Sequence, residues 1–187
     1  MVLLNNRVLL KRVAITAIAL CFFISAFAQK GEKAVGGHLS YYTEIDFYMT
    51  GIGAKFRYNI SNPIRLEGAF TYFFPKEDES FYFYSPKIHL WDLSVNGHYL
   101  FPVSNKFVIY PLVGMSVLKS TATASVLGVS ASVSESRVGF NFGGGLDFKV
   151  SDNIGINVEP KLVIGGGETP SGIQIQIIIS AGAVYNF

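Results

Sequence analysis

Ten charged side chains stand at alternate positions of short segments in which most other positions are apolar. These residues are Lys55, Arg57, Arg65, Glu67, Asp92, Arg137, Asp147, Lys149, Glu159 and Lys161. Successive side chains of a β-strand point to opposite faces, so the spacing puts these charges on one face of a sheet, together with His98. An unpaired buried ion costs several kcal/mol. If this face is enclosed, we expect a structural salt-bridge network; the alternative is a narrow ion path or gate.

Other groups that could do chemistry are poorly placed. Asp92 and His98 form no triad with any well-placed serine, and the three histidines do not have metal-ligand spacing. The glycine triplets 143–145 and 165–167 are not phosphate cradles, because no helix follows either of them. In the first triplet, glycine would let the strand bend or let a bulky inward neighbour fit. We therefore expect no catalysis, no cofactor and no metal site.

Eight alternating segments, separated by turn-forming residues, must position these side chains. They cover residues 34–42, 51–59, 64–74, 88–100, 106–118, 136–150, 154–164 and 174–187. Most match the 9–11 residues that a tilted strand needs to cross a bilayer. The connections alternate between short (60–63, 101–105, 151–153) and longer (43–50, 75–87, 119–135, 165–173). This pattern predicts an all-β fold, an eight-stranded antiparallel up-and-down transmembrane β-barrel with its short turns at one end.

The first 28 residues have the features of a cleaved secretory signal peptide. Basic residues at Arg7, Lys11 and Arg12 precede an apolar run that ends in a small-x-small cleavage site at residues 26–28. The run has roughly 16 residues, fewer than the ~20 of a spanning helix, although an uncleaved anchor is the alternative. The barrel domain would then be 29–187. Removing the signal leaves 15 − 3 = 12 basic against 13 acidic residues, a net charge of −1, which gives no argument for nucleic-acid binding.

The last segment has one apolar face that ends in Tyr185 and Phe187. With the signal peptide and the alternating loops, it makes residues 29–187 resemble the small eight-stranded OmpX/OmpA-type barrels of the Gram-negative outer membrane. The resemblance implies an integral outer-membrane protein with both termini in the periplasm and its apolar face toward the lipids. It also implies that Tyr185 and Phe187 are read by the barrel-assembly machinery. The alternative, a soluble lipocalin-like barrel, would point the apolar set inward.

The same resemblance implies a non-catalytic structural or surface-interaction role through the outer loops. Its surroundings would be outer-membrane lipids and lipopolysaccharide, and its loop partner an extracellular protein or glycan. Phe81, Tyr82, Phe83 and Tyr84 form either a contact surface or an interfacial aromatic belt. Residues 119–135 can pair as a hairpin that continues two strands, with its tip at Leu127-Gly128. An exposed strand edge of this kind can recruit a partner strand.

Two alternative functions stay open. An eight-stranded barrel is filled by side chains, so a narrow channel would need an interior that is not fully packed. His38 and Ser40 resemble the His-x-Ser motif of outer-membrane lipid A deacylases, which would make the protein a lipid-modifying hydrolase. However, Tyr42 stands where that family shows asparagine. His38 and Ser40 also fall on the inward face, whereas that family works on lipids from the outer surface of its barrel.

We expect the protein extracted from membranes to begin at Gln29, in open or cyclised form, because residues 26–28 form the cleavage site. Intact-mass measurement would detect the loss of 28 residues. A membrane-extracted chain that retains residues 1–28 would instead establish an uncleaved anchor.

Overall fold

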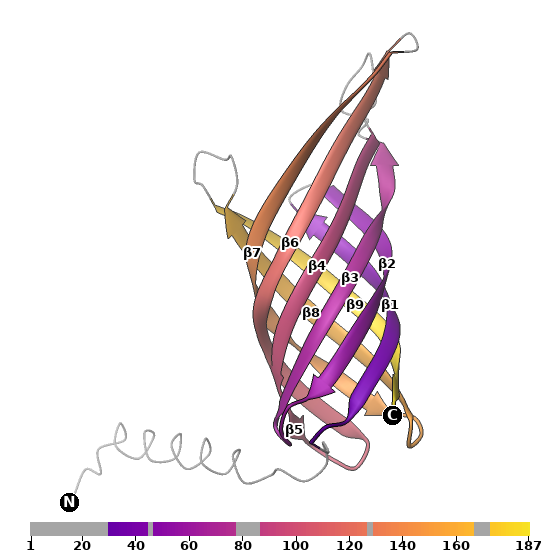
Figure 1. Cartoon of the computed structure of the whole chain (residues 1–187), viewed down its shortest axis with the longest axis vertical. Helices are drawn as coiled ribbons and strands as arrows, with labels where there is room; N and C mark the ends of the chain where they lie inside the picture. Colours follow the sequence, from indigo (N-terminus) through magenta and orange to yellow (C-terminus); the bar gives the residue numbers. More distant parts are fainter. Residues whose placement is uncertain (1–29, 45–46, 78–86, 127–128, 167–172) are drawn as a thin grey trace, which may run out of the picture.

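A computed structural model of the chain describes residues 30–44, 47–77, 87–126, 129–166 and 173–187. In these ranges eight long strands form one closed antiparallel sheet (Figure 1). They are β1 Lys33–Glu44, β2 Phe47–Asn59, β3 Ile64–Glu77, β4 Lys87–Tyr99, β6 Phe107–Val126, β7 Val129–Lys149, β8 Ile154–Gly166 and β9 Ile173–Asn186. The two-residue β5, Phe101–Pro102, pairs with the start of β6. No helix of the described residues has the length and hydropathy needed to cross a membrane.

Each long strand pairs with its neighbours in the chain, and β1 pairs with β9 to close the barrel. The predicted eight-stranded up-and-down fold is therefore confirmed. We call the end where β1 starts and β9 ends the terminal end, and the opposite end, where β6 and β7 join, the hairpin end. At the terminal end the Phe187 N–H donates to the Lys33 carbonyl at 2.9 Å. Three predicted features lie outside the described residues: the signal peptide, the run Phe81–Tyr84 and the tip Leu127-Gly128.

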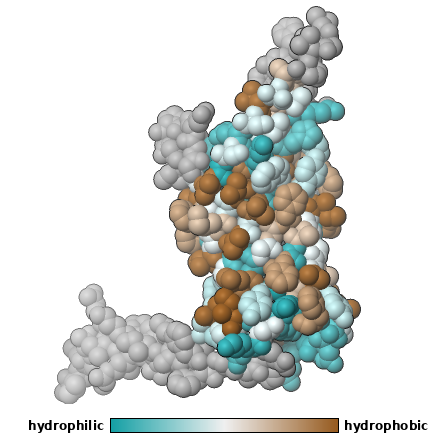
Figure 2. All heavy atoms as spheres, in the orientation of Figure 1, coloured by the Kyte–Doolittle hydropathy of each residue, from teal (hydrophilic) through white to brown (hydrophobic). Residues whose placement is uncertain are grey.

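The wall is apolar outside and polar inside. On the outer face Leu39, Val95 and Val113 are at least 60% exposed, whereas the inward-facing Glu67 and Asp92 are each 1% exposed. Figure 2 shows hydrophobic residues gathered around the middle of the visible face, with hydrophilic residues above and below them. This is the polarity of a barrel surrounded by lipid, and it contradicts the lipocalin-like alternative.

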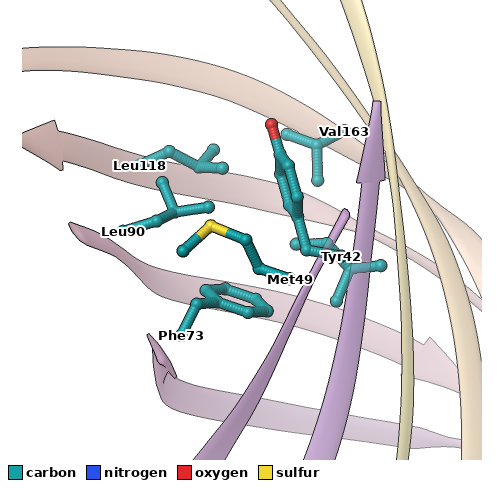
Figure 3. Packing of buried hydrophobic residues seen from close by; sticks show 7 residues of the cluster. Tyr42, Met49, Phe73, Leu90, Leu118 and Val163 are labelled. Carbon is teal, nitrogen blue, oxygen red and sulfur yellow. The ribbon is translucent and has the colours of Figure 1, made fainter. Parts of the chain in front are cut away.

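Inside the barrel, a layer of apolar side chains crosses the interior in the half nearer the hairpin end. It is contributed by seven of the eight long strands, and we call it the apolar layer: Tyr42, Met49, Phe73, Leu90, Leu118, Val163 and Ile178. Figure 3 shows these side chains pointing toward one another from several strands. A smaller cluster of Leu100, Tyr110 and Leu112 packs nearer the terminal end. Polar side chains occupy the space between the two clusters.

One predicted loop is wrong. The sequence predicts a long connection over residues 43–50, but β1 and β2 stay paired up to Glu44 and Phe47. The reason is that Met49 points inward and joins the apolar layer, so the alternation continues through this segment. In β3, by contrast, the register shifts by one residue between Phe73 and Lys76, where Pro75 has no N–H to donate to the ladder.

The predicted hairpin over residues 119–135 is confirmed in the described residues. β6 and β7 stay in register from Phe107 paired with Phe148 up to Val126 paired with Val129. The hydroxyl groups of Thr121 and Ser134 lie 2.9 Å apart across the two strands. Both strands rise above the rest of the barrel in Figure 1. The connection between β6 and β7 at the hairpin end is therefore an extension of the sheet.

We expect the backbone amides of residues 120–126 and 129–135 that bond across the β6–β7 pair to exchange slowly with solvent, whereas the alternate amides on the side of β7 without a partner strand should exchange faster. Hydrogen–deuterium exchange of the protein in nanodiscs would measure this residue by residue, with the amides of β2 as the protected reference. Uniformly fast exchange from Ser120 to Glu135 would contradict the hairpin.

Candidate functional site

The charged side chains meet in the half of the interior nearer the terminal end, with Arg57 at their centre. Arg57 on β2 and Glu67 on β3 are cross-strand partners, which brings Arg57 Nε to 2.6 Å from Glu67 Oε2. Arg57 Nη1 donates to Asp147 Oδ1 at 3.1 Å. Because Asp147 lies on β7, this guanidinium connects strands on opposite sides of the barrel.

Asp147 also accepts from a second guanidinium. Arg65 Nη1 donates to Asp147 Oδ2 at 2.6 Å, and Arg65 Nε donates to Nδ1 of its cross-strand partner His98 at 3.1 Å. Charge-assisted hydrogen bonds of this length are about twice as strong as neutral ones. The carboxylate of Asp147 therefore holds both arginines at fixed positions.

The charges in this cluster balance. Lys55 Nζ is 3.5 Å from Glu67 Oε2, and Arg57 Nη2 is 3.9 Å from Glu159 Oε2. Closer to the hairpin end, Lys161 Nζ donates to Asp92 Oδ2 at 2.7 Å. Four basic groups thus face four acidic ones, and we call these eight residues the interior charge network: Lys55, Arg57, Arg65, Lys161, Glu67, Asp92, Asp147 and Glu159.

Two of the ten charges predicted for the interior lie at its two open ends, apart from the interior charge network. Arg137 is at the hairpin end, where it binds both carboxylate oxygens of Glu135 and the side-chain oxygen of Gln174. Hydrogen bonding to the Arg137 guanidinium lowers the pKa of Glu135 below its ordinary value. Lys149 is at the terminal end, 3.1 Å from the exposed Asp152. At the hairpin end β7 continues beyond the end of its pairing with β8, whereas at the terminal end it stops level with β6 and β8.

The sequence pattern missed Tyr110, which is at the core of the site. Its hydroxyl donates to Glu159 Oε2 at 2.9 Å and accepts from Arg57 Nη2 at 3.3 Å. The ring stacks on His98 with 4.6 Å between centroids, and Arg65 lies 4.6 Å from the Tyr110 centroid. β6 is apolar on both faces around Tyr110, so no polar neighbour marks this position as inward. The nearest polar residues that share its phase are Lys106 on one side and Ser116 on the other.

Gly145 explains how the ring of Tyr110 fits. The two residues are cross-strand partners, and a Cβ added to Gly145 would overlap the Tyr110 ring. Of the two roles expected for the triplet 143–145, making room for a bulky inward neighbour is the one seen at this position. Sequence reasoning identified the glycine but not the side chain that it accommodates.

The pair on which the hydrolase alternative depends is not assembled. His38 and Ser40 face the interior, as their phase predicts, and both are buried. His38 Nε2 lies 2.9 Å from Thr71 Oγ1, whereas Ser40 Oγ lies 2.7 Å from Ser180 Oγ. Each side chain therefore has a different hydroxyl partner, and neither is on the lipid-facing surface. This arrangement does not activate Ser40 as a nucleophile.

One group of described residues has the composition of a metal site. Glu67, His98 and Glu159 offer ligand atoms within 4.8 Å of one another. The same carboxylates already pair with Arg57 and Lys55. A divalent cation would add two charges to a balanced, buried cluster. The residues therefore fit ion pairing and do not fit a metal.

The interior opens into a separate cavity at each end. The cavity at the hairpin end has a volume of about 190 Å³. Its lining includes residues of the apolar layer, among them Met49 and Leu90. The cavity at the terminal end has a volume of about 160 Å³ and reaches Arg57 and Arg65. The two share no lining residue, because the packed apolar layer and the polar side chains lie between them.

Comparison with known proteins gave one family and several related folds. The family model described as outer membrane protein beta-barrel domain matches residues 14–187. No curated protein matches the chain. Among solved structures, Ail, the attachment invasion locus protein of Yersinia pestis, is 20% identical with a TM-score of 0.57, and the match covers 85% of this chain and 100% of Ail. Ail has also been solved with the heparin analogue sucrose octasulfate.

Two further structures share the fold. The N-terminal β-barrel domain of OprF from Pseudomonas aeruginosa is 13% identical with a TM-score of 0.59, covering 86% of this chain and 100% of that domain. A major outer membrane protein from Thermus thermophilus is 10% identical with a TM-score of 0.62, covering 85% of this chain and 100% of that protein. At these identities the likeness is one of architecture.

Replacing Arg57 with methionine should lower the free energy of unfolding by about 3–5 kcal/mol, because it leaves buried carboxylates without a partner. Urea unfolding in detergent micelles would measure the loss. The double variant Arg57→Met/Glu67→Gln should recover part of it, since the charges balance again. Lys149→Met is the matched control at the terminal end, and its free energy of unfolding should be close to that of the wild type. Equal stability of all three variants would contradict the network.

Proposed function

The chain belongs to the outer membrane protein beta-barrel domain family, and on that basis we propose that it is a non-catalytic surface-recognition protein. In this proposal the β6–β7 hairpin projects outside the cell and presents a strand edge to an extracellular protein. The barrel holds the hairpin at the outer membrane, and its interior charge network serves stability alone.

The orientation rests on the connections between strands. At the terminal end the strands are joined through short segments, such as residues 60–63 between β2 and β3 and 150–153 between β7 and β8. The long β6–β7 extension lies at the opposite end. Outer-membrane barrels have short periplasmic turns and longer extracellular loops. We therefore place both termini in the periplasm and the hairpin outside.

The free edge of β7 is the observation that carries the proposal. On one side of the hairpin, β4 accompanies β6 as far as Lys87 paired with Thr123. On the other side, β8 accompanies β7 only as far as Gly139 paired with Gly165. The backbone of β7 from Val129 to Val138 therefore has no strand on that side among the described residues. Unpaired N–H and C=O groups along such an edge are a template for an added strand.

Composition favours a protein over a sulfated sugar as the partner. Ail has been solved with the heparin analogue sucrose octasulfate. Anionic sulfate groups are bound best by basic side chains. Here the hairpin residues 120–135 contain no lysine or arginine. Their alternating serine, threonine, alanine and valine side chains suit strand pairing instead.

The two alternative functions have less support. A channel would have to pass the apolar layer, in which Phe73 and Val163 are each 0% exposed. A hydrolase would need His38 and Ser40 to act together from the lipid side, but both face the interior with separate partners.

Replacing residues 121–134 with an Asn-Gly turn should abolish recognition and leave the barrel folded, because Ser120 and Glu135 are cross-strand partners that a two-residue turn can join. Binding of fluorescent vesicles that carry the protein to immobilised serum and matrix proteins would measure recognition.

The matched control replaces the same residues with a glycine–serine linker of equal length. This variant keeps the length of the loop but removes the strand, so it should also lose binding. Wild-type binding by the shortened barrel would refute a role for the hairpin. If the linker variant binds and the shortened barrel does not, loop length matters and the strand edge does not.

A further inference from the structure

The cavity at the hairpin end has an apolar part and a polar part. Its apolar part is lined by Met49, Leu90 and Leu118, each at most 5% exposed. Tyr42 also lines the cavity, and its ring lies 5.6 Å from the ring of Phe73. Figure 3 shows these five side chains together, with the Tyr42 hydroxyl directed away from Phe73. The apolar layer thus closes the cavity on its terminal side.

The polar part lies closer to the hairpin end. Glu44 follows Tyr42 on β1 by two residues, which keeps the inward phase of the strand. The last pair between β1 and β9 is Thr43 with Ile177, so Glu44 and Gln176 are next in register on neighbouring strands. Both side chains line the cavity. A carboxylate and an amide are therefore placed side by side next to the apolar surface.

Both of these groups have hydrogen-bonding capacity that the protein leaves unused. The Tyr42 hydroxyl donates to Glu44 Oε2 at 2.8 Å, whereas Glu44 Oε1 has no partner among the described residues. Gln176 is 5% exposed, and its Nε2 lies 3.5 Å from Gln174 Oε1. In the same part of the chain, no group donates to the side-chain oxygen of Gln176. The polar part of the cavity is therefore rich in acceptors.

The charges that surround the cavity do not balance. Its basic residue, Arg137, binds both carboxylate oxygens of Glu135 and the side-chain oxygen of Gln174. In the described structure no basic side chain lies within ion-pair distance of Glu44. One guanidinium thus faces two carboxylates, and 1 − 2 leaves one negative charge. This excess favours a cation in the cavity and disfavours an anion.

We propose that the cavity at the hairpin end binds a small primary amine that carries an aromatic ring. An ammonium group has three N–H donors and no acceptor, which suits the carboxylate of Glu44 and the side-chain oxygen of Gln176. The ring packs against Met49, Leu90 and Leu118. An apolar cavity of about 150 Å³ can hold benzene. The volume of about 190 Å³ therefore accommodates one ring with a short amine arm.

The methionines of the chain provide a direct reporter of this site. The chain has three: Met1 lies in the predicted signal peptide, Met49 lines the cavity, and Met115 is 49% exposed on the lipid-facing surface. The protein, labelled on its methionine methyl groups, can be titrated with phenethylamine in phosphatidylcholine nanodiscs and followed by NMR. We expect a saturable shift of the Met49 methyl signal. The Met115 signal reports amine that merely dissolves in the lipid, and it should not follow the same curve.

Two comparisons test the role of the carboxylate. Glu44→Gln should raise the dissociation constant of phenethylamine at least about tenfold, as expected for the loss of a charged hydrogen-bond partner. Glu32→Gln, which removes a carboxylate at the terminal end, should bind like the wild type. Phenethyl alcohol has the same ring and arm without the charge, so it should bind the wild-type protein at least about tenfold more weakly than the amine. This second comparison needs no variant to fold.

The proposal is overturned if Met49 shows no saturable shift, or if Met49 and Met115 shift in parallel. It is also overturned if the alcohol binds as tightly as the amine, or if a folded Glu44→Gln barrel binds the amine like the wild type.

This site goes beyond the proposed function and does not depend on it. The barrel in which an Asn-Gly turn replaces residues 121–134 keeps Ser120, Arg137 and every other lining residue of the cavity. It should therefore bind phenethylamine like the wild type although it has lost the strand edge. Failure of the hairpin to recognise a protein would leave this inference standing, and a failed amine titration would leave the hairpin function standing.

Discussion

Every backbone polar group inside a bilayer must find its partner within the protein, and this constraint determines the rest of the structure. The chain meets it by pairing β1 with β9, which removes both edges of the sheet at the depth of the lipids. Closing eight strands leaves an interior wide enough for side chains only. The inward residues must therefore pack against one another and neutralise one another, and both requirements are visible in this barrel.

The two halves of the interior meet these requirements differently. Near the terminal end, polar groups are paired through Arg57, Asp147 and Tyr110, and Gly145 provides the space for the Tyr110 ring. Near the hairpin end, the apolar layer fills the cross-section with packed side chains. Removing water from a charge cluster raises the cost of any unpaired ion. The apolar layer lies between this cluster and the cavity at the hairpin end. It therefore makes accurate charge pairing on its terminal side more important.

Strand periodicity was enough to predict the fold, because alternation depends only on the order of residues in the chain. Arg57, Glu67 and six other charges that it assigned to one face belong to the interior charge network. It could not show where the enclosed network ends, so Arg137 and Lys149 were grouped with it although they lie at the two open ends and pair with Glu135 and Asp152. It also missed Tyr110, because its partners Glu159 and Arg57 come from strands distant in sequence. Such contacts depend on the register between strands and on the curvature of the closed sheet, which a pattern along one chain does not contain.

The distribution of charge along the chain has a consequence for the order of folding. The interior groups of β1 to β4 are Lys55, Arg57 and Arg65 against Glu67 and Asp92, so 3 − 2 leaves one positive charge. Those of β6 to β9 are Lys161 against Asp147 and Glu159, so 1 − 2 leaves one negative charge. Each half of the barrel would therefore hold an uncompensated ion if it entered the membrane alone. Neutrality arrives only when the two halves meet, so insertion and ring closure should be a single cooperative event, with half-barrels disfavoured as intermediates.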